Sequence, residues 1–299
     1  VLNSNMTIGW VKGDEVAIND GEATWKFVAE PSASSNRNAI LSPVDAQVSM
    51  SEGNTYYALY PYDEHAVWEG GKVTLSLQVT DPQLWSCDQP NCYTLETILG
   101  SQSIQQNVGF RTARLTADKG LFLNDEPVKL HGVCLHHDLG ALGAAFNEKA
   151  ARRQLATMRR MGVNALRTSH NPPAKPVMDL CDEMGILVLD EAFDMWEHCK
   201  TTYDYGRFFC DCWQQDVRSW VRRDRNHPSL LMWSIGNEIS DVNDPRGEEV
   251  TRMLCEAVRL HDPEKNGFTT FGSNYMPWEG AQKCAEWIDA VGYNYAERY

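Results

Sequence analysis

The segment that most constrains the fold of this chain is the largely apolar run 230–235, which has turn-forming residues before it and a glycine after it. Such a run predicts a strand that is buried on both faces, as in a parallel sheet covered by helices. The run leads directly into Gly236, Asn237 and Glu238. An amide and a carboxylic acid therefore stand at the carboxyl end of the strand, which is where α/β barrels carry their active sites.

From about residue 118 the expected strands alternate with expected helices, which is typical of a parallel barrel. Asn147 is placed to begin one helix, which Gly162 ends, and Gly185 ends the next helix. The expected strands cover residues 128–133, 163–167, 186–189, 230–235, 267–272 and 290–293. We therefore predict an incomplete (β/α)8 TIM barrel over residues 117–299, with six of its eight strands.

Two β-rich regions precede the predicted barrel. Residues 1–69 contain short strand-like runs separated by turn signals, including the aromatic run 56–62. Residues 73–79 alternate between apolar and polar types, as a half-buried strand does. We therefore expect a multidomain protein with a β-rich N-terminal region, 1–69, a second β region, 70–116, and the barrel, 117–299.

Composition excludes some classes of partner. The net charge of −14 in 299 residues argues against nucleic acid, because phosphates bind to basic surfaces. No run reaches the roughly 18 apolar residues that a membrane span needs. The nine cysteines lack the paired spacing of a zinc site, and we expect most to be reduced thiols, although Cys87 and Cys92 could form a disulfide in an oxidising compartment.

Polar side chains follow five of the expected strands at their carboxyl ends. They are His136 and His137 after the first strand, Arg167 and His170 after the second, Asp190, Glu191 and Trp196 after the third, Asn237 and Glu238 after the fourth, and Asn294 and Tyr295 after the sixth. Because the carboxyl ends of parallel strands meet at one edge of a barrel, we expect one polar pocket there. Such a cluster is typical of catalysis rather than of stability.

Residues 224–238, Asp-Arg-Asn-His-Pro-Ser-Leu-Leu-Met-Trp-Ser-Ile-Gly-Asn-Glu, resemble the acid/base signature of glycoside hydrolase family 2 at every position. Residues 164–172 resemble the second signature of that family, and residues 73–111 resemble the closing strands of its immunoglobulin-like β-sandwich. The family includes β-galactosidases, β-glucuronidases and β-mannosidases. The resemblance implies an O-glycosyl hydrolase with a carbohydrate substrate, and the loop 134–140 is similar to that of bacterial β-galactosidases.

The resemblance also implies roles for individual residues. Glu238 corresponds to the general acid/base, which must bring a proton to the leaving oxygen of the sugar. Asn237 corresponds to the amide that binds the sugar 2-hydroxyl, a contact that strengthens in the transition state. Arg167 and Tyr295 correspond to residues that flank the nucleophile. His136, His170 and Asp190 correspond to residues that line the sugar subsite, and Trp196 corresponds to a wall on which the sugar stacks.

Structural roles remain open for several of these residues, because polar clusters also occur at structural ion pairs. Asp190 and Glu191 could form an ion pair with Arg167, and His170 could stabilise the turn that follows it. His136 could lie in a loop without contacting a ligand, and Trp196 could pack in the core. The sequence contains no recognisable metal site, and Mg²⁺ near the acid/base is expected only by analogy with some β-galactosidases of the family. The oligomeric state is open.

One departure from the family separates two hypotheses. The family carries its nucleophilic carboxylate after a seventh barrel strand, and this sequence ends at Tyr299, after the sixth. Retention needs that second carboxylate at about 5–5.5 Å from the acid/base. The alternative to an enzyme is thus an inactive glycosidase fragment that binds carbohydrate weakly. A loose resemblance of residues 10–62 to fimbrillin-like surface proteins suggests fusion to an adhesin-like region and favours the bacterial periplasm or cell surface.

Overall fold

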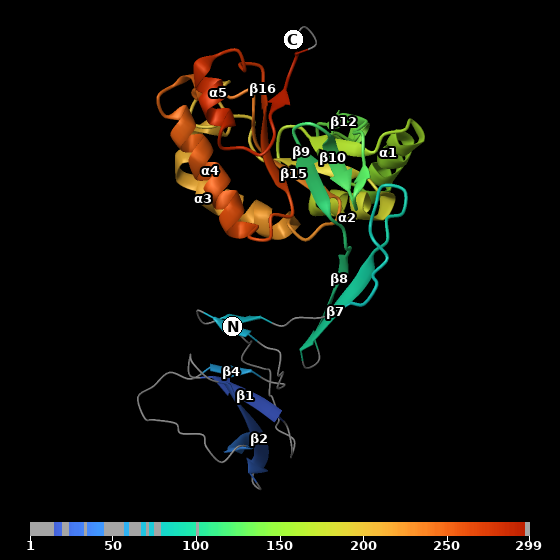
Figure 1. Ribbon diagram of the computed structural model, residues 1–299, viewed down its shortest axis with the longest axis vertical. Coiled ribbons are helices and arrows are strands. Elements are labelled where there is room, and N and C mark those ends of the chain that lie inside the picture. The colour runs from blue at the N-terminus through green and yellow to red at the C-terminus, as the bar shows by residue number, and fades with distance from the viewer. Residues whose placement is uncertain are drawn as a thin grey trace. The chain divides into compact units, whose positions relative to one another are not determined.

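The computed structural model describes residues 15–19, 24–32, 35–44, 57–59, 67–69, 72–74, 79–99 and 102–296. The chain forms two compact units, of which the first is Val1–Asp81 with Leu99–Gln102 and the second is Pro82–Ile98 with Ser103–Tyr299. Figure 1 shows the elements of both units. Among the described helices, none is both long and apolar enough to cross a membrane.

The first unit contains an antiparallel sheet with the strand order β3-β2-β1-β4. Its strands are β1 (Glu15–Asn19), β2 (Thr24–Ser32), β3 (Ser35–Pro43) and β4 (Tyr57–Leu59), and a separate pair is formed by β5 (Val67–Glu69) and β6 (Lys72–Thr74). Val16, Ile18 and Phe27 form its small core. The aromatic run contributes β4 as a strand, whereas residues 10–14, which begin the fimbrillin-like resemblance, lie outside the described part of the chain.

The second unit begins with short β elements, part of which packs against the barrel. They are β7 (Tyr93–Leu99) and β8 (Gln102–Val108), which form one sheet, and β9 (Ala113–Thr116), β10 (Gly120–Leu123) and β11 (Glu126–Pro127), which form another. Trp85 is fully buried in a core that also contains Leu187 and Leu231 from barrel strands. Arg111 donates a hydrogen bond from Nε to the carbonyl of Pro228 (2.6 Å), two residues before the start of the barrel strand β15. These contacts join the β elements to the barrel.

The barrel strands form one parallel sheet in chain order, β12-β13-β14-β15-β16-β17. They are β12 (Gly132–Leu135), β13 (Ala165–Thr168), β14 (Leu187–Glu191), β15 (Leu230–Asn237), β16 (Phe268–Ser273) and β17 (Gly292–Tyr293). The connecting helices are α1 (Glu148–Arg160), α2 (Lys175–Met184), α3 (Gly206–Asp224), η2 (Ser240–Asn243), α4 (Gly247–His261) and α5 (Glu279–Ala285), with η1 (Gly140–Leu142) after β12. In Figure 1 α3 and α4 lie side by side. The prediction of an incomplete TIM barrel is confirmed.

Local signals set the helix ends as the sequence predicted. The Oδ1 of Asn147 accepts a hydrogen bond from the backbone N–H of Ala150 (3.1 Å) and so caps α1. Gly185 ends α2 in the left-handed conformation, with φ of 68°. A Cβ there would lie 2.2 Å from the carbonyl oxygen of Cys87, so the position needs glycine both for its φ and for its lack of a side chain.

The first barrel strand differs from the prediction. We expected a strand at 128–133, but β12 covers Gly132–Leu135. Val128 instead donates its backbone N–H to the carbonyl of Leu121 in β10 (2.9 Å) and packs against the core around Trp85. Val128 therefore belongs to the β elements that precede the barrel. An apolar pattern predicts that a residue is buried, but it does not show which element the residue packs against.

Candidate active site

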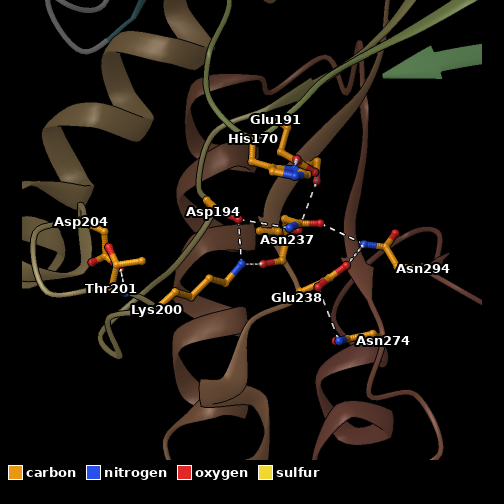
Figure 2. A network of polar contacts seen from close by, with 12 residues as sticks. His170, Glu191, Asp194, Lys200, Thr201, Asp204, Asn237, Glu238, Asn274 and Asn294 are labelled. Carbon is orange, nitrogen blue, oxygen red and sulfur yellow. Dashed lines mark hydrogen bonds and ion pairs between the residues drawn. The ribbon is translucent and has the colours of Figure 1, made fainter. Parts of the chain in front are cut away.

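The carboxyl ends of β13, β14 and β15 bring three polar side chains together, namely Arg167, Glu191 and Asn237. Figure 2 shows the network that continues from Glu191 and Asn237 to the acid at position 238. The parallel order of the strands explains this convergence, because consecutive strands deliver their last residues to the same edge of the sheet. The ends of these strands are thus joined by a continuous hydrogen-bond network.

Glu191 anchors one end of the network. Its side chain is fully buried, and its Oε2 accepts hydrogen bonds from Arg167 Nη2 (2.9 Å) and from Ser234 Oγ (2.6 Å). On the other oxygen, His170 Nδ1 lies 2.6 Å from Oε1. A buried carboxylate is tolerated when charged and hydrogen-bonding partners surround it in this way. Glu191 therefore holds Arg167 and His170 in fixed orientations at the strand ends.

Asn237 occupies the centre of the network and is almost completely buried. Its Oδ1 accepts hydrogen bonds from Arg167 Nη2 (2.7 Å) and from Asn294 Nδ2 (2.9 Å). Its Nδ2 donates to Asp194 Oδ1 (3.1 Å). Because donors face the oxygen and a carboxylate faces the nitrogen, only one orientation of the amide satisfies all three contacts.

Glu238 follows Asn237 and is half-buried. Its φ of 47° lies in the left-handed region, which is uncommon for a residue with a side chain. The backbone N–H of Glu238 donates to the carbonyl of Gly272 (2.7 Å). The carboxylate accepts hydrogen bonds from Asn294 Nδ2 (2.9 Å) and from Asn274 Nδ2 (3.5 Å). The turn thus presents a carboxyl group between two amides at the edge of the sheet.

Gly272 in β16 lies against the same network. A Cβ built on it would lie 2.7 Å from Arg167 Nη2, 3.2 Å from Asn294 Oδ1 and 3.3 Å from Asn237 Oδ1. A methyl group cannot approach a guanidinium nitrogen to 2.7 Å without displacing it, so the arrangement of the three side chains depends on glycine here.

Two predicted residues do not join the network. Asp190 precedes Glu191 on β14 and, because side chains alternate along a strand, lies on the face covered by α3, beside Trp220 and Asp224. Burial and the charge of Asp224 raise the pKa of Asp190 well above its ordinary value. Trp196 is fully buried and donates from Nε1 to the carbonyl of Ile235 (2.8 Å), so core packing replaces the expected stacking wall.

Two further predicted residues lie at the margin of the network. The ring of His136 is placed edge-on to that of His170, with ring centroids 5.2 Å apart. Tyr295 directly follows Asn294, has a φ of 54° and is 75% exposed. His136 therefore reaches the network through its ring contact with His170, and Tyr295 adjoins it as the residue after Asn294.

Asp194, Lys200 and Asn274 belong to the network although the sequence pattern predicted no role for them. Lys200 Nζ donates to Asp194 Oδ1 (2.7 Å) and to the backbone carbonyl of Asn237 (2.8 Å). Asn274 directly follows β16, so the rule applied to the other strand ends could have found it. Lys200 lies in the loop between β14 and α3, where no periodic pattern identifies a site residue.

A cavity of about 520 Å³ borders the network at His170 and Asp194. Its other walls are largely apolar and include Phe193, Met195 and Trp220. Neither Asn237 nor Glu238 lines this cavity. An acid acting from position 238 would therefore not act inside it.

The groups around Glu238 do not fit the Mg²⁺ site suggested by family analogy. Mg²⁺ binds oxygen ligands. The amide groups of Asn274 and Asn294 turn their nitrogens, not their oxygens, toward the Glu238 carboxylate. The ammonium group of Lys200 supplies the positive charge beside Asp194. These groups therefore offer Glu238 hydrogen-bond donors where a Mg²⁺ ion would need oxygen ligands.

The chain matches two sequence models of one family. Residues 115–277 match "Glycosyl hydrolases family 2, TIM barrel domain", and residues 19–111 match "Glycosyl hydrolases family 2". The second match begins inside the β-rich N-terminal region, 1–69. The two matches together extend over both compact units.

Similar proteins and structures include enzymes of this family. The chain is 49% identical over 267 residues to "Beta-galactosidase BoGH2A" of Bacteroides ovatus, which covers 76% of the chain and 31% of that protein. It is 33% identical over 208 residues to "Beta-glucuronidase" of Bacteroides fragilis, covering 67% of the chain and 30% of that protein. A family 2 crystal structure from Bacteroides cellulosilyticus matches with a TM-score of 0.68 and 32% identity, over 94% of the chain and 33% of that structure. The chain spans about a third of each of these relatives, and it belongs to glycoside hydrolase family 2.

Proposed function

We propose that this chain carries the acid/base side of a retaining β-glycosidase site, with Glu238 as the general acid/base. The observation that carries the proposal is the position of the Glu238 carboxylate, which accepts a hydrogen bond from Asn294 Nδ2 (2.9 Å) at the carboxyl ends of the barrel strands. The second N–H of that amide binds Asn237 Oδ1 (2.9 Å). One amide group therefore fixes the acid relative to the residue proposed to bind the sugar.

In the proposed reaction, a nucleophilic carboxylate forms a bond to the anomeric carbon while the bond to the leaving oxygen breaks. Glu238 donates its proton to that oxygen and becomes a carboxylate. It then takes a proton from water, which attacks the anomeric carbon and releases the nucleophile. We do not assign the nucleophile to Glu191, because Arg167, His170 and Ser234 already engage its carboxylate.

The proposed sugar contacts use the remaining members of the network. Asn237 binds the 2-hydroxyl of the sugar beside the anomeric carbon. His136 and His170 line the sugar subsite, a proposal supported by the contact of His170 with the buried Glu191. Arg167 and Tyr295 stand beside the nucleophile, where the guanidinium charge favours an ionised carboxylate.

We propose β-galactosides as the substrates, because the relative with 49% identity is named a β-galactosidase. A relative with 33% identity is named a β-glucuronidase, so β-glucuronides are the second candidate. A second candidate function is binding of carbohydrate without turnover. It is favoured by the pairing of the carboxylates of Glu191 and Asp194 with Arg167 and Lys200, which gives both carboxylates a structural role in the network.

The test measures nitrophenol release from aryl β-galactoside, β-glucuronide, β-mannoside and β-glucoside by the purified protein and by Glu238→Gln. We expect the substitution to lower kcat/KM for p-nitrophenyl galactoside by on the order of 10²–10⁴-fold. The loss should be smaller for a 2,4-dinitrophenyl leaving group, which needs no proton to depart. Equal losses with both leaving groups would exclude the role of general acid.

The matched control is Glu256→Gln on α4, which changes a carboxylate paired with Arg252 on the helix surface. It should leave every rate within twofold of the unsubstituted protein. Sugar binding without nitrophenol release by the unsubstituted protein would favour the binding function over the enzymatic one.

A further inference from the structure

We propose that Asp194 and Lys200 are positioning residues that fix Asn237 so that it presents one N–H to the substrate. This inference rests on the proposed function, in which Asn237 contacts the sugar 2-hydroxyl. Asp194 and Lys200 act through Asn237 and need not touch the sugar. Figure 2 shows both side chains converging on Asn237 from the loop between β14 and α3.

The side-chain amide of Asn237 has almost all of its hydrogen-bonding positions occupied within the protein. An amide oxygen has two acceptor positions, and an amide nitrogen has two donor hydrogens. Both acceptor positions of Oδ1 are used, by Arg167 and Asn294. One hydrogen of Nδ2 is used by Asp194. A single N–H remains, so Asn237 can meet a substrate only as a hydrogen-bond donor, and the group that it meets must be an acceptor such as a hydroxyl oxygen.

Lys200 holds the carboxylate that orients the Asn237 amide. Its Nζ bonds to Asp194 Oδ1 (2.7 Å), the same oxygen that accepts from Asn237 Nδ2 (3.1 Å). An ammonium group at this distance limits the movement of the oxygen that determines the direction of the amide. Without Lys200 the carboxylate could rotate away from Asn237.

Lys200 also contacts the backbone between Asn237 and Glu238. Lys200 Nζ also donates to the carbonyl oxygen of Asn237 (2.8 Å), which belongs to the peptide group that joins Asn237 to Glu238. Glu238 has a left-handed φ of 47°, a conformation that persists in a residue with a side chain only when its surroundings hold it. The N–H of the same peptide group is held by Gly272 (2.7 Å). Lys200 thus contributes one of the two contacts that fix this peptide.

The loop that carries Lys200 is itself held at two points. Asp204 Oδ2 accepts from the backbone N–H of Thr201 (2.7 Å), and its Oδ1 accepts from that of Gly206 (3.0 Å). On the other side of Lys200, the backbone N–H of His198 donates to Asp241 Oδ1 (3.0 Å). These contacts fix the backbone around Lys200, so the ammonium group reaches Asn237 from an ordered segment.

A role limited to folding stability would be a weak alternative. The side chains of Lys200 and Asp194 are 30% and 35% exposed, and an ion pair this accessible to water contributes little to stability. A positioning role should instead alter discrimination at the sugar 2-position. That readout separates the two roles.

The experiment compares the unsubstituted protein with Lys200→Met, Lys200→Arg, Asn237→Ala and the control Lys175→Met. Lys175 forms an ion pair with Asp179 on the surface of α2. For each protein, kcat/KM is measured on p-nitrophenyl β-galactoside and on its 2-deoxy analogue. We expect the ratio of the two values to fall on the order of tenfold in Lys200→Met, as in Asn237→Ala, with partial recovery in Lys200→Arg. Equal losses on both substrates would overturn the inference.

A second measurement needs no turnover. Crystal structures of Lys200→Met and Lys175→Met would show the direction of the Asn237 amide and the peptide before Glu238. A reoriented amide or peptide in Lys200→Met alone supports the inference, and an unchanged geometry overturns it. If the unsubstituted protein releases no nitrophenol, the proposed enzymatic function fails, and these crystal structures still decide the role of Lys200.

Discussion

Asp190 and Glu191 are consecutive residues at the end of β14, and both are fully buried, but they have opposite surroundings. Glu191 receives hydrogen bonds from Arg167 and Ser234 and contacts His170. Asp190 instead lies beside another acid, Asp224, and its burial together with the charge of Asp224 outweighs the opposing effect of Arg223 and raises its pKa. The comparison shows that the face of the strand, more than the residue type, decides whether a buried carboxyl group meets hydrogen-bond donors of a site or another acid.

The strand geometry gives the physical reason. Successive side chains point to opposite faces of a sheet, so one of two neighbours must face α3 when the other faces the network. A buried carboxylate beside a guanidinium is stabilised by the opposite charge, whereas two buried carboxyl groups cannot both ionise without cost. Three substitutions test this contrast.

The largest effect is expected for Glu191→Gln. The glutamine amide offers no carboxylate to Arg167 and His170, and its NH₂ group would face their N–H groups. We expect the free energy of unfolding at pH 7 to fall by about 3 kcal/mol, the lower end for breaking a buried ion pair. Urea denaturation would measure the loss. In Glu183→Gln, which removes an exposed partner of Arg152, the change should be about 1 kcal/mol or less.

An intermediate effect is expected at the buried carboxylate of Asp182, whose partner is His227 Nδ1 (2.6 Å). Burial alone would lower the pKa of His227, but the hydrogen bond and the charge of Asp182 outweigh it and raise this pKa above its ordinary value of 6.5. The stabilisation is therefore complete below pH 6.5 and is lost as the pH rises through the folded-state pKa.

His227→Gln should accordingly lower the free energy of unfolding by about 1.5 kcal/mol at pH 5.5 and by less at pH 9. Urea denaturation across this range gives both values. A difference that stays constant from pH 5.5 to pH 9 would contradict the assigned pair. Agreement would show that a cationic partner stabilises a buried carboxylate away from the network as well.

The smallest effect is expected for Asp190→Asn. Because the pKa of Asp190 is raised in the folded protein, the folded state binds more protons than the unfolded state above pH 3.8. The contribution of Asp190 to stability therefore falls as the pH rises toward the folded-state pKa. An amide resembles the neutral acid and avoids this loss. We expect stability within about 1 kcal/mol of the unsubstituted protein at pH 5, and equal or higher stability at pH 8. A loss at pH 8 as large as that of Glu191→Gln would remove the contrast.

The barrel could be predicted from the sequence because β15 is buried on both faces and because α1 and α2 each have one clear end signal. The run 230–235, Asn147 and Gly185 each gave a signal that depends only on neighbouring residues. Asn237 and Glu238 could be selected for the same reason, because they directly follow a strong strand.

The finer assignments depended on information that a single sequence does not contain. Whether Asp190 or Glu191 faces the network is a difference of one residue in strand orientation, and a short apolar strand does not reveal it. Trp196 lies in a loop but is enclosed by the core, which no local pattern indicates. Lys200 reaches Asn237 across the long interval between their positions in the chain, so only the fold brings the two together.

Gly272 has a consequence for how mutational data on this protein would be interpreted. Its missing side chain leaves the space in which groups from Arg167, Asn237 and Asn294 approach one another. In a scan of all substitutions, position 272 should therefore be as intolerant as a catalytic position, although glycine has no functional group to offer a sugar. Intolerance at position 272 would reflect the close spacing of its neighbours. A ranking of positions by loss of activity alone would therefore place Gly272 among the catalytic residues, although it takes no part in the reaction.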